Sequence, residues 1–210
     1  MAYAKIAVFV TQKEYNANGY SAQNLVTDEL RERLDNTNLG YNVIGATDTP
    51  DMSTQDAGCG DAGLLNNWDN LVDNCYVNPC TADSHLLISN ATAIEGCAGT
   101  PGNTCVMSGG PHLASASGLS RYGPQTNPYK TFNGCAQEIF HNFNVYHKHG
   151  DNNYNNYSYG WYVSPMLTTY KDNHCGEDNN CNDPIACDDP DGYDTQWTEC
   201  AENRAESYLS

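Results

Sequence analysis

A strand–helix–strand pattern at the start of the chain limits the possible folds more than any other feature of the sequence. The apolar stretch Ala4–Thr11 ("AKIAVFVT") is rich in β-forming residues and predicts a buried strand. Ser21–Leu34 places leucines and a valine at helical spacing, with a serine able to cap the first turn. Tyr41–Thr47 ("YNVIGAT") predicts a second strand. This order forms a right-handed crossover, so we expect the two strands to lie parallel in one sheet.

Helices and strands continue to alternate along the chain. Asp61–Cys75 is weakly helical, and Ser84–Ser89 predicts a third strand. Gly96–Gly110 is rich in turn residues and predicts an edge region that ends in a short strand at Cys105–Ser108. Lys130–Phe143 predicts a helix with one apolar side. That side carries Ala136, Ile139, Phe140 and Phe143.

The composition changes after Gly150. Residues 151–162 are polar and aromatic, and residues 172–200 are acidic and dense in cysteine. Neither stretch has clear helical or strand periodicity, so we expect an irregular C-terminal lobe held by disulfides.

The cysteine content predicts a disulfide-bonded protein. The ten cysteines are even in number and form no CxxC pair, which argues against a cysteine-ligated zinc ribbon. We predict five disulfides made in an oxidising compartment, and hence a secreted, extracellular protein. Two N-x-S/T glycosylation acceptors, Asn90 and Asn156, fit secretion. The cysteines are Cys59, Cys75, Cys80, Cys97, Cys105, Cys135, Cys175, Cys181, Cys187 and Cys200.

The charge balance argues against two classes of partner. Nine basic residues stand against 26 acidic ones, which gives a formal net charge of −17. Such a surface repels phosphate, so we expect neither nucleic acid nor an anionic membrane as a partner. No apolar stretch approaches the roughly 20 residues of a membrane-spanning helix.

The stretch "GCAQEIFHNFNVYHKHG" has the residue types and spacing of a metal site. Gln137 and His141 are four residues apart, so a helix presents them on one face, with Glu138 beside them. A glutamate next to metal ligands can take a proton from a metal-bound water. Asparagine accepts a left-handed backbone, so Asn144 can end this helix and turn the chain. The turned chain can then deliver His147 as another ligand.

These residues resemble the signature of the metzincin zinc peptidases, HExxHxxGxxH. Here the signature reads "QEIFHNFNVYH", and many adamalysin-like members share the inner "HNF". Tyr162–Tyr170 ("YVSPMLTTY") resembles the family's Met-turn, which places a methionine, here Met166, beneath the metal. Upstream, "SHLLIS" and "GCAG" resemble the family's third strand and the antiparallel edge strand that lines the substrate cleft.

The resemblance implies a fold and a function. It implies an α+β fold: a twisted, mostly parallel sheet with an antiparallel edge strand, an active-site helix and an irregular, disulfide-rich C-terminal lobe. Residues 1–210 would form one catalytic domain, with an N-terminal subdomain over 1–150 and a Cys/Asp/Asn-rich subdomain over 151–210. The implied activity is secreted, zinc-dependent cleavage of a protein or peptide substrate.

The implied site residues divide into catalytic groups and metal ligands. Glu138 would act as the general base, and Tyr170 would stabilise the oxyanion, as a tyrosine after the Met-turn does in some relatives. His141, His147 and Gln137 would bind zinc. Gln137 departs from the family's first histidine, and an amide oxygen is a poor zinc ligand beside imidazole, so we expect weak zinc binding.

Two other functions stay open at this point. Gln137 could leave a catalytically inactive pseudopeptidase on the same fold, or the chain could be an extracellular structural or binding protein. Asp188–Asp194 ("DDPDGYD") spaces carboxylates like a calcium loop but lacks the glutamate that closes an EF-hand, so calcium is a second candidate cation. His149 is a further candidate ligand. The other histidines, His85, His112 and His174, are expected to be structural or on the surface.

Overall fold

The computed structural model describes most of the N-terminal 146 residues and parts of the C-terminal region. The described residues are 2–52, 63–91, 96–114, 127–146, 152–153, 162–163, 166, 192–193, 197 and 199–210.

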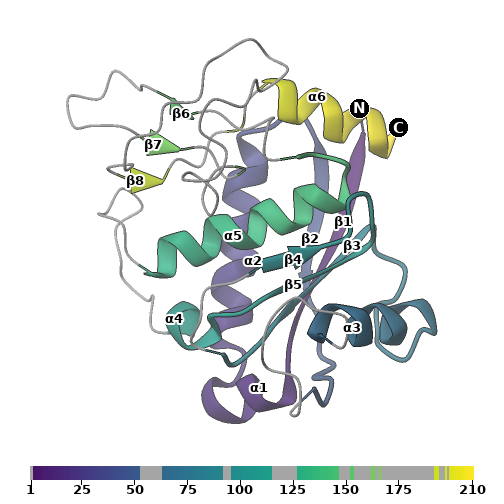
Figure 1. The fold of residues 1–210 in the computed structure, drawn as a ribbon, viewed down its shortest axis with the longest axis vertical. Helices are drawn as coiled ribbons and strands as arrows, with labels where there is room; N and C mark the ends of the chain where they lie inside the picture. The colour runs from purple at the N-terminus through teal and green to yellow at the C-terminus, as the bar shows by residue number, and fades with distance from the viewer. Residues whose placement is uncertain are drawn as a thin grey trace.

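A five-stranded sheet with the order β2-β1-β3-β5-β4 forms the centre of the fold (Figure 1). Its strands are β1 (Tyr3–Val10), β2 (Gly40–Gly45), β3 (Ser84–Ile88), β4 (Gly96–Ala98) and β5 (Thr104–Met107). β1 pairs in parallel with β2 and β3, and β3 with β5, whereas β4 runs antiparallel to β5 at the edge. The predicted class, a mostly parallel sheet with one antiparallel edge strand, is therefore confirmed.

Alternating strand residues build two apolar cores, one on each face of the sheet. In β1, Ile6 and Val8 face the larger core, which α2 (Ser21–Asp35) and α5 (Asn127–Asn142) cover. Ala7 and Phe9 face the smaller core, which α3 (Leu64–Asp73) covers. This arrangement explains why β1 is apolar along most of its length, because a parallel strand covered on both faces has no solvent side.

The smaller core centres on Trp68. Its ring meets Phe9 edge to face at a centroid distance of 4.9 Å, and its Nε1 donates a hydrogen bond of 3.0 Å to the carbonyl oxygen of His85 in β3. His85 is fully buried, and its Nδ1 lies 2.9 Å from the carbonyl oxygen of Asn103. His85 is therefore a structural residue, as expected.

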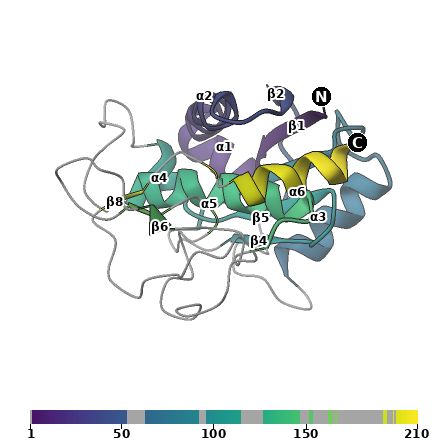
Figure 2. The ribbon, with the colours of Figure 1, turned by 90° about the horizontal axis from the view of Figure 1, so that it is seen from above.

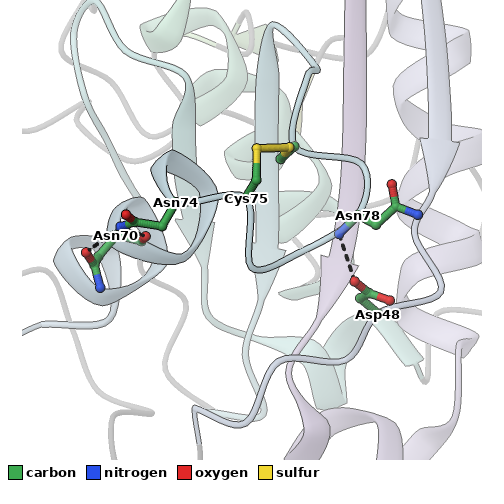
Figure 3. Close-up of a disulfide and its surroundings, with 6 residues drawn as sticks. Asp48, Asn70, Asn74, Cys75 and Asn78 are labelled. Carbon is green, nitrogen blue, oxygen red and sulfur yellow. Dashed lines mark hydrogen bonds between the residues drawn. A yellow bond between two sulfur atoms is a disulfide. The ribbon is translucent and has the colours of Figure 1, made fainter.

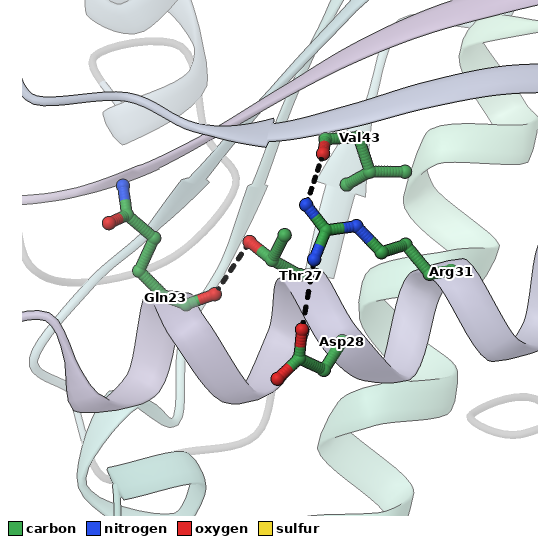
Figure 4. A network of polar contacts seen from close by, with 5 residues as sticks. All are labelled: Gln23, Thr27, Asp28, Arg31 and Val43. Atoms are coloured by element: carbon green, nitrogen blue, oxygen red, sulfur yellow. Dashed lines mark hydrogen bonds and ion pairs between the residues drawn. The ribbon is translucent and has the colours of Figure 1, made fainter.

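Polar side chains of α2 fasten this helix to the sheet edge. Gln23 bridges two strand ends, because its Nε2 donates to the carbonyl oxygens of Val8 at 2.6 Å and Ala46 at 2.7 Å. Arg31 reaches from α2 to β2, where its Nη2 donates to the carbonyl oxygen of Val43 at 2.8 Å (Figure 4). Asp28 holds the other end of the same guanidinium at 3.0 Å.

A buried arginine connects α2 to α5. The side chain of Arg33 is 1% exposed, and its Nε donates to Asn133 Oδ1 in α5 at 2.9 Å. Its Nη1 pairs with Glu29 at 2.6 Å. Because a buried guanidinium must be fully paired, this contact fixes how the two helices lie against each other.

Regular structure extends further into the C-terminal region than the sequence indicated. Three two-residue strands, β6 (Asn152–Asn153), β7 (Tyr162–Val163) and β8 (Gly192–Tyr193), form a second small sheet. Helix α6 (Glu199–Leu209) follows and was not predicted. Its buried residues, Ala201 and Ala205, are alanines, which give little periodic signal. The short helices α1 (Gln12–Asn18) and α4 (Gly110–Ala114) were also missed.

The prediction of five disulfides is wrong. Cys105 and Cys135 are free and buried, which leaves eight cysteines for at most four bonds. The two thiols lie in the larger core, where they act as small apolar groups, and burial raises the pKa of both, so they stay protonated and unreactive.

The disulfide-bonded cysteines among the described residues lie in a loop, in the edge strand and in the last helix. Cys75 and Cys80 form a bond that closes the loop after α3 (Figure 3). Beside it, the backbone N–H of Asn78 donates to Asp48 Oδ2 at 2.7 Å. Cys97 in β4 and Cys200 in α6 are also disulfide-bonded. In the described part of the chain, no helix combines the length and apolarity needed to cross a membrane.

The burial of His85 predicts a stability loss in acid. Burial lowers the pKa of His85, and this outweighs the opposing effects of the Asn103 carbonyl and of Asp83 and Asp73. The unfolded chain therefore binds a proton more readily, so the stability from neutral His85 is complete above an unfolded pKa of about 6.5 and falls below it.

Urea unfolding at about pH 7.5 and about pH 5 measures this effect. The free energy of unfolding of the wild type is expected to fall more between these pH values than that of His85→Leu. An equal decrease in the free energy of unfolding of both proteins would contradict the prediction that His85 is buried in its neutral form.

Candidate functional site

Helix α5 carries the three described residues of the predicted site on a fully buried surface. Gln137, Glu138 and His141 are 0%, 4% and 7% exposed. The sheet covers one side of α5, and Trp197 covers another by stacking on Phe140 at a ring-centroid distance of 3.6 Å. Figure 2 shows α6, which follows Trp197, lying above α5. Gln137, Glu138 and His141 are thus removed from solvent.

The predicted helix end at Asn144 is confirmed. Asn144 has a left-handed backbone with φ of 64°. Its N–H donates to the carbonyl oxygen of His141 at 3.0 Å, and the N–H of Val145 donates to that of Phe140 at 3.1 Å. These two bonds form a Schellman motif, and the burial of Phe140 and Val145 in one core supplies its usual apolar pair. The chain therefore turns sharply just after His141.

The turn also sets the chemistry of His141. Its Nδ1 lies 2.7 Å from the carbonyl oxygen of Val145, and because a carbonyl only accepts, Nδ1 carries the proton. Burial lowers the pKa of His141, an effect stronger than the opposing effect of this hydrogen bond, so the ring is neutral near pH 7. A neutral imidazole oriented through Nδ1 presents its Nε2 lone pair, which is the usual arrangement of a metal-binding histidine.

Glu138 lies under the edge strand. A Cβ built on Gly96 of β4 would lie 2.7 Å from Glu138 Cδ, so only glycine lets the strand approach the carboxyl group this closely. Burial raises the pKa of Glu138 to about 8, although the hydrogen bond from Gln137 acts in the opposite direction. Without a metal, the carboxyl group is therefore mostly protonated at neutral pH.

Gln137 contacts Glu138 directly. Its Nε2 donates a long hydrogen bond of 3.4 Å to Glu138 Oε1. Of the two polar atoms of the Gln137 amide, the oxygen is the one whose chemistry suits a cation. The donor set available on α5 is thus one imidazole nitrogen and one amide oxygen, which fits zinc only with further ligands.

Asn142 fastens the end of α5 to the sheet, a role the sequence did not indicate. Its side-chain amide, oriented to satisfy its neighbours, donates to the carbonyl oxygens of Thr104 at 2.8 Å and Gly99 at 3.2 Å, and accepts from Ser84 Oγ at 2.7 Å. These bonds join α5 to β3, β5 and the turn between β4 and β5. They hold the helix end, and so His141, in place.

The remaining predicted site residues are only partly described. Met166 is fully buried and belongs to the same apolar core as α5. His147, His149 and Tyr170 lie outside the described residues, and so does most of Asp188–Asp194. Within the described ranges, no three His, Cys, Asp or Glu side chains meet in a way that could hold a metal ion.

Comparisons with known proteins find similarity of fold only. No protein-family model and no curated protein matches the chain. A chain in the structure of a chaperone–substrate complex aligns with a TM-score of 0.53 at 11% identity, over 99% of this chain and 34% of that one. Metalloproteinase-II from Bacteroides fragilis aligns with a TM-score of 0.46 at 8% identity, over 99% and 53%.

The chain thus spans about a third and about half of the length of these two solved chains. At 11% identity the first match shows a shared fold alone, and the second supports no statement about activity.

The buried carboxyl group predicts a stability loss at alkaline pH. Because the folded pKa of Glu138, about 8, exceeds its unfolded value of 4.5, the folded state holds the proton more tightly. The contribution of Glu138 to stability is complete below pH 4.5 and is lost as the pH rises through 8. Glu138→Gln is expected to remove this loss, on the order of a few kcal/mol.

The measurement is the free energy of unfolding of chelator-treated protein at about pH 5 and about pH 8.5. An unchanged pH dependence in the variant would show that the carboxyl group ionises freely in the folded protein.

The contact between Gly96 and Glu138 predicts an energetic coupling between β4 and α5. Gly96→Ala is expected to lower the free energy of unfolding by about 1–3 kcal/mol, because the added methyl group overlaps the carboxyl side chain. Glu138→Ala should relieve most of that loss in the double variant. Strictly additive effects in this double-mutant cycle would argue against the close approach.

Proposed function

We propose that this protein is a secreted, zinc-dependent endopeptidase of the metzincin type whose metal site is weakened by Gln137. The observation that carries the proposal is the end of α5, where a neutral, oriented His141 and a buried Glu138 precede a left-handed turn at Asn144.

The zinc ligands in this proposal come from the helix and from the chain after its turn. His141 Nε2 and His147 would supply imidazole nitrogens, and the amide oxygen of Gln137 would complete the set of protein ligands. Loss of a residue that only supports a metal ligand lowers metal affinity about 10–100-fold. Replacement of a ligating imidazole by an amide is expected to weaken zinc binding by at least as much. Met166 would lie beneath the site, as the resemblance implies.

The proposed reaction is hydrolysis of a peptide bond. A bound zinc ion supplies a Lewis acid that polarises the scissile carbonyl and acidifies a water. Glu138 would take the proton of that water and deliver it to the leaving amine. Tyr170 would donate a hydrogen bond to the oxyanion.

The environment in this proposal is extracellular. The disulfide between Cys75 and Cys80 and the bonded Cys97 and Cys200 are compatible with an oxidising compartment. The substrate would be a protein or peptide, with neither nucleic acid nor membrane as a partner, in keeping with the net charge of −17. Calcium binding at Asp188–Asp194 remains a proposal.

One observation favours a second candidate, a pseudopeptidase that binds peptides without cleaving them. The amide nitrogen of Gln137 points at Glu138 and donates to it. If this hydrogen bond persists, it occupies Oε1 of Glu138, the residue that must act as the base. The two candidates differ in the metal content of the purified protein and in its hydrolytic activity.

The proposal predicts that Gln137→His strengthens the site. Wild-type protein purified without chelator should contain less than one zinc per chain and cleave casein slowly. Gln137→His should raise both the zinc content and the cleavage rate, because imidazole is the better zinc ligand. Elemental analysis and a casein assay measure the two quantities.

The double variant Gln137→His/Glu138→Gln is the matched control. It should bind zinc like Gln137→His but cleave nothing, because the base is absent. Full zinc occupancy with rapid hydrolysis in the wild type would contradict the proposal that Gln137 weakens the zinc site. No zinc and no cleavage in any variant would reject the peptidase and favour an extracellular structural or binding protein.

A further inference from the structure

The C-terminal helix contacts the turn that orients His141. Arg204 of α6 donates a hydrogen bond from Nε to the carbonyl oxygen of Asn144 at 3.1 Å. Its guanidinium carbon lies 5.7 Å from the centroid of the Tyr146 ring, within the range of a cation–π contact. Asn144 and Tyr146 flank Val145, whose carbonyl holds the ring of His141. One arginine thus touches both neighbours of the group that orients the histidine.

Several contacts hold the C-terminal segment firmly against α5. Trp197 stacks on Phe140 with an interplanar angle of 14°. Ala201 and Ala205 are buried in the same core as α5. Because α6 is fixed by its apolar side, Arg204 projects from a rigid base rather than from a free chain end.

Among the described residues, the guanidinium group of Arg204 has two side-chain contacts, the Asn144 carbonyl and the Tyr146 ring. Arg204 lines an open hollow of about 570 Å³ together with Asn144, Cys200, Asn203, Ser207 and Tyr208. None of these lining residues is acidic, although the chain carries 26 acidic residues. Within the described part of the chain, the guanidinium group is therefore placed by the turn.

We propose that Arg204 is a positioning residue that holds the turn at residues 144–146, and through the Val145 carbonyl the ring of His141, in the orientation that the proposed zinc site needs. The inference rests on the proposed zinc site. It goes beyond that proposal by assigning the C-terminal helix a part in building the site. Removal of the guanidinium group frees the Asn144 carbonyl and uncovers Tyr146, so the turn, and with it the ring of His141, becomes less well fixed.

The test compares Arg204→Ala with a matched control, Arg31→Ala. Arg31 is also a partly exposed arginine with one hydrogen bond to a backbone carbonyl, that of Val43, but it lies on α2 beside the far edge strand. In the Gln137→His background, Arg204→Ala should weaken zinc binding about tenfold, a loss of about 1.4 kcal/mol, while Arg31→Ala leaves it unchanged. Competition with a chelating dye measures the zinc affinity.

A metal-free measurement separates this inference from the proposed function. Amide hydrogen exchange at Val145, whose N–H bonds to Phe140, should be faster in Arg204→Ala than in wild type, and Arg204→Lys should restore part of the protection. If no variant binds zinc, the proposed function fails, and so does the metal-related role of Arg204, even if exchange changes. If zinc binds but its affinity is unaffected by Arg204→Ala, the proposed function stands and the positioning role is overturned.

Discussion

The burial of polar side chains on α5 is the constraint on which the rest of the structure depends. This helix lies between the central sheet and the C-terminal segment, so each polar group on it needs a partner within the protein. Arg33 pairs with Asn133, and Asn142 bonds to β3, to β5 and to the turn between β4 and β5. These pairings leave α5 little freedom to rotate or slide, and that rigidity gives the site its fixed geometry.

The same burial produces the acid–base properties of the site. Loss of water disfavours the charged form of every group, which lowers the pKa of His141 and raises that of Glu138. The ring of His141 is therefore neutral near pH 7, and the carboxyl group of Glu138 is mostly protonated. In the proposed zinc site, Gln137 is a poorer ligand than a histidine would be. The amide nitrogen of Gln137 donates a hydrogen bond to Glu138.

Disulfide bonds and apolar packing stabilise different parts of the fold. The described disulfide, Cys75–Cys80, closes a loop, and Cys97 and Cys200 are bonded on an edge strand and on the last helix. Cys105 and Cys135, in contrast, face the core and stay reduced. Loops and edges gain most from a cross-link because they bury little apolar surface, whereas a core-facing thiol already contributes through packing.

The sequence alone determined what depends on neighbours along the chain. Strand and helix periodicity predicted β1, α2, β2 and α5, and the tolerance of asparagine for a left-handed backbone predicted the turn at Asn144. Only the tertiary structure decided which cysteines pair, how Gly96 approaches Glu138, and that Arg204 reaches Asn144. These contacts join residues far apart in the chain, and their formation depends on how the helices pack on the sheet. The pattern of residues in a short stretch of the chain does not show which distant residues pack together.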